Sequence, residues 1–145
     1  MPRASIYFDK KGDCLIFPLW RDENGVSIKS IKYIKLEDVY EEKELGKKIL
    51  EAFETSAINE QEDRTQNAWK IATNLKNWRT FQKKYECIVA DIDEKGICYI
   101  AKYRKLKDGS YGLEKGDEEK YSREYTEPLT AEQLGHIVLE MLAIK

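Results

Sequence analysis

Hydrophobic and polar residues follow a helical pattern in two separate stretches of the chain. In residues 44–53 and again in 133–142, apolar positions recur at intervals of three and four, which places them on one side of a helix. Each stretch also contains a Leu-Gly pair, with the glycines at Gly46 and Gly135. A glycine inside a helix costs about 1 kcal/mol relative to alanine. Its recurrence at the same place predicts a backbone approach too close for a methyl group.

A strand-like pattern precedes each of these helices. Apolar runs at 6–8 and 14–20, separated by a turn containing Gly12, predict a β-hairpin, and residues 26–36 predict one further strand or two short ones. The first helix is expected at about 40–56. The second set of strands is expected at 87–92, 97–103, 111–113 and 120–125. Thr130 then starts the last helix as its N-cap, with Gln133 placed as in a capping box.

The turns of the two strand-rich stretches match at one constant offset, which indicates an internal repeat of about 4–58 and 86–145. The matching residues are Asp9, Gly12, Cys14, Ile16 and Gly25 in the first copy and Asp93, Gly96, Cys98, Ile100 and Gly109 in the second. The helix recurs at a slightly larger offset, so a few extra residues are expected in 114–120. Between the copies, an apolar helical stripe predicts one connecting helix at about 64–83.

These elements predict a single α+β domain over residues 1–145. Its mainly antiparallel sheet is built from two meander-plus-helix halves joined by the connecting helix, and the repeated helices cover one face. The strand at 97–103 has apolar residues on both faces. The second face is therefore also expected to be covered, either by the connecting helix or by a partner subunit.

Composition limits the classes of partner. Charged residues make up 36% of the chain but nearly cancel at a net charge of -2, so no overall attraction to nucleic acid or to a membrane is expected. No apolar run approaches the roughly 20 residues that span a bilayer. The first residues lead into a strand pattern rather than a signal peptide, and the predicted location is cytoplasmic. The sequence gives no indication about self-association.

Cysteine and histidine give no sign of a bound metal or cofactor. Cys14, Cys87 and Cys98 are odd in number and lack metal-ligand spacing, so buried reduced thiols are predicted. His136 lies one helical turn from both Glu132 and Glu140, opposite the apolar stripe. A solvated histidine flanked by charges is predicted there, rather than a metal site or a proton-transfer group.

Motifs for catalysis are also missing, which argues against an enzyme. There is no glycine-rich phosphate loop, serine elbow or zinc-protease motif. Asp91 and Asp93 share one strand face and are the pair that a metal-dependent hydrolase would need. Asp93, however, stands at a hairpin turn where Asp9 stands in the first half, and aspartate is common there because it caps backbone groups.

Residues 102–107 mix lysine, arginine and tyrosine, and together with Tyr99 they favour the main alternative, a platform for single-stranded nucleic acid. The acidic residues that follow at 114–119 oppose this interpretation. The segment 117–125 is itself acidic and aromatic: tyrosines offer rigid contact area and carboxylates complement a cationic partner. The competing interpretation of 117–125 is an exposed edge strand protected by its charges.

The segments 77–81 (Asn-Trp-Arg-Thr-Phe) and 128–135 (Pro-Leu-Thr-Ala-Glu-Gln-Leu-Gly), with the two Leu-Gly helices, resemble a family of contact-dependent growth inhibition immunity proteins. The resemblance covers most of the chain. It implies a small cytoplasmic antidote, without catalytic residues, that binds the toxic C-terminal domain, often a nuclease, delivered by a neighbouring bacterium.

The expected partner is therefore a cognate toxin domain, and the expected function is its neutralisation. A nuclease tends to be basic around its active site, so an acidic patch could steer the inhibitor onto it. A nucleic-acid-binding module stays the alternative, followed by a metal-dependent hydrolase. The predicted toxin contacts are Asp117, Glu118, Glu119, Tyr121, Glu124 and Tyr125, with Asp22 and Glu23 as second choice.

Overall fold

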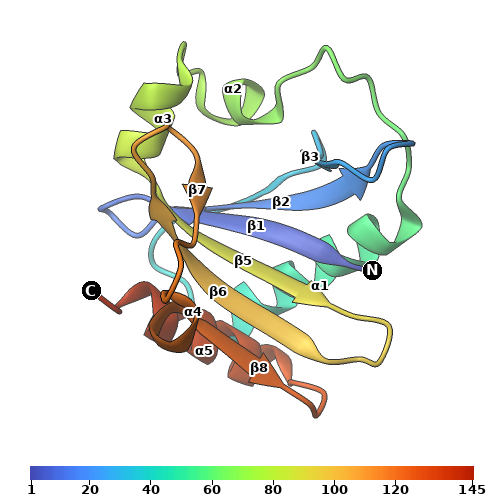
Figure 1. Cartoon of the computed structure of the whole chain (residues 1–145), viewed down its shortest axis with the longest axis vertical. Coiled ribbons are helices and arrows are strands. Elements are labelled where there is room, and N and C mark those ends of the chain that lie inside the picture. Colours follow the sequence, from blue (N-terminus) through green and yellow to red (C-terminus); the bar gives the residue numbers. More distant parts are fainter.

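The computed structural model describes residues 1–145 and contains an eight-stranded antiparallel sheet with five helices (Figure 1). The predicted α+β class is confirmed. The first half contains β1 (Arg3–Phe8), β2 (Cys14–Arg21), β3 (Ser27–Lys29), β4 (Ile34–Leu36) and α1 (Glu42–Ile58). The second half contains β5 (Glu86–Ile92), β6 (Cys98–Lys105), β7 (Tyr111–Gly112), α4 (Glu118–Tyr121), β8 (Ser122–Tyr125) and α5 (Ala131–Leu142). Two helices, α2 (Ala68–Thr73) and α3 (Trp78–Lys84), connect the halves.

The sheet is arranged around the central pair β1 and β5. Its order is β3-β2-β1-β5-β6-β7, with β4 also paired to β2 and β8 to β6. The registers are equivalent in the two halves: Phe8 lies opposite Cys14, and Ile92 lies opposite Cys98. Both halves therefore have the same strand layout about the centre, and the second has a longer connection, containing α4, before its last strand. Descent of the halves from one duplicated unit stays a prediction.

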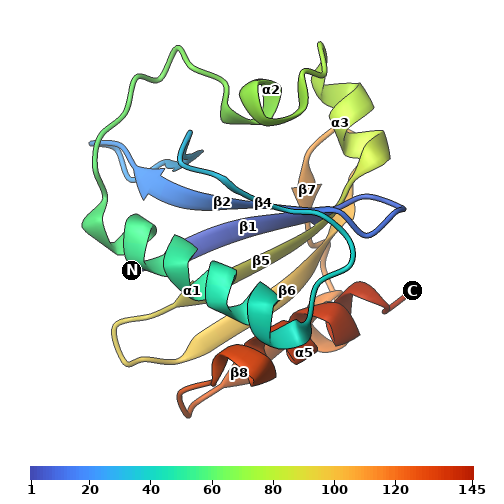
Figure 2. The ribbon, with the colours of Figure 1, turned by 180° about the vertical axis from the view of Figure 1, so that it is seen from behind.

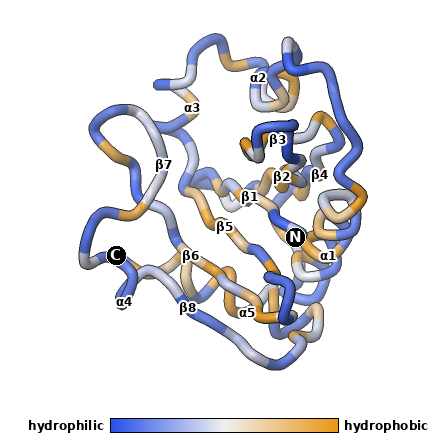
Figure 3. The backbone as a smooth tube through the Cα atoms, turned by 45° about the vertical axis from the view of Figure 1, so that its right-hand side comes forward, coloured by the Kyte–Doolittle hydropathy of each residue, from blue (hydrophilic) through white to orange (hydrophobic).

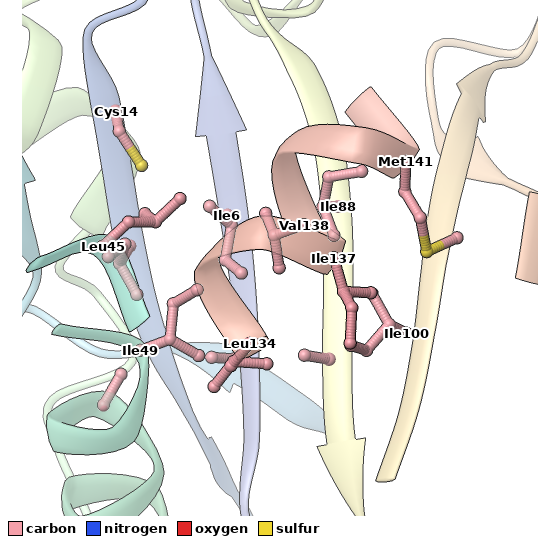
Figure 4. Close-up of a cluster of buried hydrophobic side chains, with 14 of the residues drawn as sticks. Ile6, Cys14, Leu45, Ile49, Ile88, Ile100, Leu134, Ile137, Val138 and Met141 are labelled. Carbon is pink, nitrogen blue, oxygen red and sulfur yellow. The ribbon is translucent and has the colours of Figure 1, made fainter. Parts of the chain in front are cut away.

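One face of the sheet is covered by α1 and α5, which lie side by side across it (Figure 2). Their apolar stripes pack on the sheet, because the three-and-four spacing of each helix turns its leucine, isoleucine and valine side chains to one side. Figure 4 shows Leu45, Ile49, Leu134 and Val138 converging with Ile6 of β1. Each of these side chains is at most 1% exposed, so this layer is the main core.

The close backbone approach that the sequence predicts at Gly46 and Gly135 is confirmed, and in each case the neighbour is the other Leu-Gly helix. A Cβ atom on Gly46 would stand 1.7 Å from the backbone oxygen of Ala131 on α5. A Cβ atom on Gly135 would stand 1.8 Å from the backbone oxygen of Glu42 on α1. Each glycine thus faces the first turn of the other helix, and the contact joins the two halves of the molecule.

The second face of the sheet is covered in part by α2 and α3, and here the prediction of one connecting helix at 64–83 is wrong. The helical pattern is interrupted at Asn74, which ends α2 in the left-handed conformation at φ 61°. Asn77 then caps α3 by accepting a hydrogen bond from the Thr80 N–H. Asparagine tolerates left-handed geometry and is a favoured N-cap, so the two asparagines divide the segment into two helices.

The buried layer beneath these helices is rich in aromatic rings. Its fully or nearly buried members are Tyr7, Leu15, Phe17, Ala68, Phe81, Tyr85, Cys87 and Val89. Phe81 stacks on Trp78 with ring centroids 4.9 Å apart, and it also contacts Tyr7 at 5.1 Å. These contacts fix α3 against the strands of the first half.

The strand predicted at 120–125 begins later than expected. Glu118–Tyr121 form one helical turn, and β8 starts at Ser122. The three cysteines are buried and free, as predicted, and burial raises the pKa of Cys87 to about 12. None of the five helices combines the length and the apolar character that crossing a bilayer requires.

Candidate partner-binding surface

The connector α2–α3 leaves part of the second sheet face uncovered. Under the connector, Leu15 and Phe17 of β2 are 2% and 0% exposed. The equivalent positions on β6 are Tyr99 and Ala101, because Leu15 pairs with Tyr7 as Tyr99 pairs with Asp91. Tyr99 is 38% exposed. Figure 1 looks onto this face, and no helix crosses in front of β5 and the first part of β6. We call Asp91, Asp93, Tyr99, Ala101 and Glu124 the open-face patch.

Carboxylates surround the tyrosine of the open-face patch. Tyr99 lies directly opposite Asp91 on β5 and Glu124 on β8, which places the three side chains on one face. The Tyr99 hydroxyl donates to Asp93 Oδ2 at 3.4 Å. Partial desolvation and then the negative charge of Glu124 raise the pKa of Tyr99, so it stays neutral. An aromatic ring within a ring of carboxylates suits a cationic side chain.

The charge of Asp91 is only partly balanced within the chain. Its carboxylate lies 3.9 Å from Arg3 Nε. The guanidinium of Arg3 donates instead to Ser27 Oγ at 3.3 Å and to the Tyr103 hydroxyl at 3.2 Å, and its Nε has no hydrogen-bond partner. Desolvation, helped by the negative charge of Asp93, outweighs the positive charges of Arg3 and Arg21, and the pKa of Asp91 is raised. Asp91 can accept a further charged donor.

The predicted contacts around α4 are divided between structural and free groups. Asp117 accepts the Glu114 N–H at 2.8 Å and pairs with Arg104 Nη1 at 3.2 Å, and these hydrogen bonds lower its pKa. Arg104 also stands over the Tyr121 ring, 5.5 Å from its centroid. Glu118 and Glu119 are exposed and line a surface concavity. Asp117 and Tyr121 therefore stabilise the segment around α4, and the side chains of Glu118 and Glu119 are free to contact a partner.

Strand alternation separates the two remaining residues of that segment. Glu124 is exposed on the second face, where it is part of the open-face patch. Tyr125 lies opposite Cys98 and packs against the core under α1 and α5. The acidic and aromatic segment 117–125 is thus not one continuous surface.

Asp22 is placed where it supports a turn. Its side chain is 1% exposed and accepts the N–H groups of Asn24 and Val26, each at 2.9 Å, and Arg64 Nη1 at 2.8 Å. The Val26 N–H, followed by that of Asn24 and the charge of Arg64, lowers the pKa of Asp22. Glu23 is exposed at the tip of the same turn. Of this second-choice pair, Glu23 alone faces solvent.

The structure does not assemble the predicted nucleic-acid platform. Lys102 points to the helical side, where its ammonium donates to the carbonyl oxygen of Leu142 at 2.8 Å and to that of Ile144. Lys105 pairs with Glu86 at 3.7 Å. Tyr99, Tyr103 and Lys105 lie on the second face and Lys102 lies on the helical face, so the basic residues of 102–107 are divided between two surfaces.

The structure also gives different roles to Asp91 and Asp93, the pair that a metal-dependent hydrolase would need. Asp93 Oδ1 accepts the N–H groups of Lys95 at 2.8 Å and Ile97 at 3.0 Å, as Asp9 Oδ1 does for the equivalent residues of the first hairpin. Asp93 thus caps a turn, as the repeat indicates. The chain contains no group of three or more histidine, cysteine, aspartate or glutamate side chains placed to hold a metal ion.

His136 joins the two long helices at the surface. Its Nδ1 lies 2.7 Å from Glu42 Oε2 on α1, and its Nε2 lies 3.2 Å from Glu140 Oε2. The sequence predicts charged neighbours for His136, and Glu140 is one of the predicted neighbours. The second partner is Glu42 rather than the predicted Glu132, because the close approach of α1 at the glycines brings the first turn of α1 beside His136.

The His136 contact predicts a pH-dependent contribution to stability. The hydrogen bond with Glu42, followed by the charges of Glu42 and Glu140, raises the pKa of His136 above 6.5. The contribution is therefore complete below pH 6.5 and is lost as pH rises through the folded-state pKa. In chemical denaturation, the stability advantage of the native chain over His136→Gln should shrink as the pH rises above 6.5.

Lys47→Gln supplies the control for this measurement. Lys47 occupies the exposed position after the glycine of α1, as His136 does on α5. Its substitution removes a surface charge and leaves His136 in place, so its effect should not vary with pH in the same way. An equal and pH-independent advantage over both variants would refute the role of His136.

Comparison with known proteins gives a similarity of fold. No family model and no curated protein sequence matches this chain. A solved protein of unknown function from Neisseria meningitidis is 14% identical, with a TM-score of 0.72 over 98% of this chain and 93% of its own. A chain of the CdiA-CT/CdiI toxin and immunity complex from Yersinia pseudotuberculosis is 10% identical, with a TM-score of 0.71 over 98% of this chain and 95% of its own. The architecture is therefore shared over almost the entire length with a member of a toxin and immunity complex.

Proposed function

We propose that this chain is an immunity protein that binds and neutralises the C-terminal toxin domain of a contact-dependent growth inhibition system. The observation that carries the proposal is the likeness of fold, at a TM-score of 0.71, to a chain of the CdiA-CT/CdiI toxin and immunity complex. The resemblance of residues 77–81 and 128–135 to immunity proteins supports the same assignment independently of the fold.

The surface of the protein suits binding rather than catalysis. The open-face patch is a half-covered sheet surface with an exposed tyrosine and under-neutralised carboxylates. Aromatic residues are enriched at protein interfaces, and complementary charge speeds association. An inhibitor of this kind needs no catalytic residue and no cofactor, and its place of action is the cytoplasm, where a delivered toxin acts.

The charge of the surface supports one kind of toxin. A nuclease binds phosphates, so its active-site surface carries lysine and arginine. The carboxylates of this chain are complementary to such a surface, and they support a nuclease as the toxin domain.

A binding measurement tests the proposal. The reading frame directly upstream of this gene should encode a large secreted protein that ends in a toxin domain. That C-terminal domain, purified in an inactivated form, should form a 1:1 complex with this chain with a dissociation constant of about 1 nM. A toxin domain from an unrelated system is the specificity control. The proposal fails if titration calorimetry detects no complex with the upstream domain.

A further inference from the structure

The two halves of the sheet have equivalent strand pairing, but the connector covers their second face unequally. In the first half, Tyr7, Leu15 and Phe17 are buried beneath Trp78 and Phe81 of the connector. The connector occurs once in residues 1–145, between the halves, and in the second half it packs on Cys87, Val89 and Tyr111. The equivalent surface of the second half is therefore left open at the end where β5 and β6 meet.

The residues on the uncovered half differ from their covered equivalents in a consistent way. Tyr99 stands where the first half has Leu15, Asp91 where it has Tyr7, and Ala101 where it has Phe17. Large buried side chains are thus replaced by a carboxylate, a tyrosine and a small alanine, which expose little apolar surface to water. A tyrosine keeps a rigid apolar ring while its hydroxyl stays hydrated, as on surfaces that are free at some times and bound at others.

From this asymmetry we infer that the toxin docks on the open-face patch with a cationic surface, so that the toxin covers the part of the second half that the connector leaves exposed. This inference rests on the proposed function and adds the location and the charge of the contact.

Charge determines which kind of partner fits the patch. Asp91, Asp93 and Glu124 converge on Tyr99 from β5, from the β5–β6 turn and from β8. The neighbouring Arg3 is engaged with Ser27 and Tyr103 rather than hydrogen-bonded to Asp91. An arginine of the partner can therefore lie over the Tyr99 ring and pair with Asp91 or Glu124, which combines a cation–π contact with charge-assisted hydrogen bonds.

The α4 segment is less suited to a cationic partner, because its carboxylates and its tyrosine ring are already in contact with cations of this chain. Asp117 is paired with Arg104, and Lys120 stands over the Tyr121 ring, 5.2 Å from its centroid. The charge around α4 is mixed, and its tyrosine already has two cations of this chain beside it. A matched comparison between the two surfaces is therefore possible, with Glu118 of α4 as the control for Glu124.

The experiment measures binding of the inactivated C-terminal domain encoded directly upstream. Tyr99→Ala and Glu124→Lys should each weaken binding by about 30-fold or more, the size expected for a central contact. Glu118→Lys, an identical charge reversal at an exposed α4 position, should change affinity by less than about fivefold. The association rate of the native chain should fall with added salt, and that of Glu124→Lys should fall less.

The outcomes separate this inference from the proposed function. If the native chain does not bind the domain, the proposed function fails and the docking face fails with it. If the native chain binds, and Glu118→Lys weakens binding while Tyr99→Ala and Glu124→Lys do not, the function stands and the docking face is wrong. Denaturation curves identify a variant that has lost its fold, and Glu124→Lys, which is exposed, keeps the test valid if Tyr99→Ala unfolds.

A second copy of this chain is the competing occupant of the patch. Sedimentation of the native chain and of Glu124→Lys distinguishes the two. A monomer at concentrations where the toxin binds supports the toxin as occupant. A dimer that Glu124→Lys dissociates, without any change in toxin affinity, assigns the patch to self-association and overturns the inference.

Discussion

Replacing Gly46 with alanine is expected to lower the free energy of unfolding by about 3 kcal/mol, at the upper end of the range for overpacking. On an isolated helix the same change would stabilise by about 1 kcal/mol. Here the new methyl carbon would stand 1.7 Å from the backbone oxygen of Ala131, so α1 and α5 must separate to admit it. A backbone carbonyl group cannot move out of contact with the new methyl group by a side-chain rotation, as a flexible side chain could.

Chemical denaturation with matched variants measures this effect. Gly135→Ala meets the backbone oxygen of Glu42 at 1.8 Å and should cost a similar amount. The double variant should lose less than the sum, because the first methyl group already separates the helices. Lys47→Ala, at the exposed neighbouring position of α1, should change stability by less than about 0.5 kcal/mol. Native stability in both glycine variants would show that the close helix contact is wrong.

Replacing Phe81 with alanine should cost about 3 to 5 kcal/mol, the range for removing a buried aromatic side chain. Phe81 is 0% exposed and is the buried residue of α3. Its ring lies between Trp78 at 4.9 Å and Tyr85 at 4.7 Å, measured between ring centroids. Loss of the ring leaves a cavity beneath α3 and removes the contact that fixes the connector to the sheet.

Hydrogen exchange gives the specific readout for Phe81→Ala. The amides of α2 and α3 should exchange faster relative to the native chain than those of α1 and α5, because the connector loses its anchor first. Lys83→Ala, an exposed change on the same helix, should leave both stability and exchange near native. Uniform loss of protection over the entire chain would contradict the view of the connector as a separately anchored cover.

Local periodicity was sufficient to predict much of this fold. The hairpins, the two long helices and the capping box at Thr130 follow from alternation, helical spacing and cap chemistry. The glycine contact could be predicted because the same unfavourable residue occurs at the same place in both helices. The break at Asn74 was missed, since the apolar stripe runs on through it and hides the change of helix axis.

Less of the candidate surface than of the fold could be predicted from the sequence. Acidic residues close in sequence were grouped at 117–125, but strand alternation turns Glu124 and Tyr125 to opposite faces. The charge of Asp22 predicts a surface contact, but its side chain is buried and pairs with Arg64, which lies far away in the sequence. The signal for the open-face patch was present in the repeat, where Tyr99 aligns with the apolar Leu15. Recognising it required knowing which half the connector covers.

The two faces of the sheet have different roles. The helix pair on the first face joins the halves through backbone contacts that leave no room for variation. The second face is covered by the connector except around Tyr99 and Glu124, so a partner can bind there without disturbing the core. On this view the helices stabilise the scaffold, and the partner is recognised by side chains of β5, β6 and β8.

Toxin neutralisation in living cells tests the central claim most directly. Bacteria carry the active C-terminal domain encoded directly upstream under an inducible promoter, with the native chain, Glu118→Lys or Glu124→Lys supplied from a second plasmid. Growth after induction should be restored by the native chain and by Glu118→Lys, and restored poorly by Glu124→Lys. Continued growth arrest in cells that contain abundant, folded native chain would contradict the account.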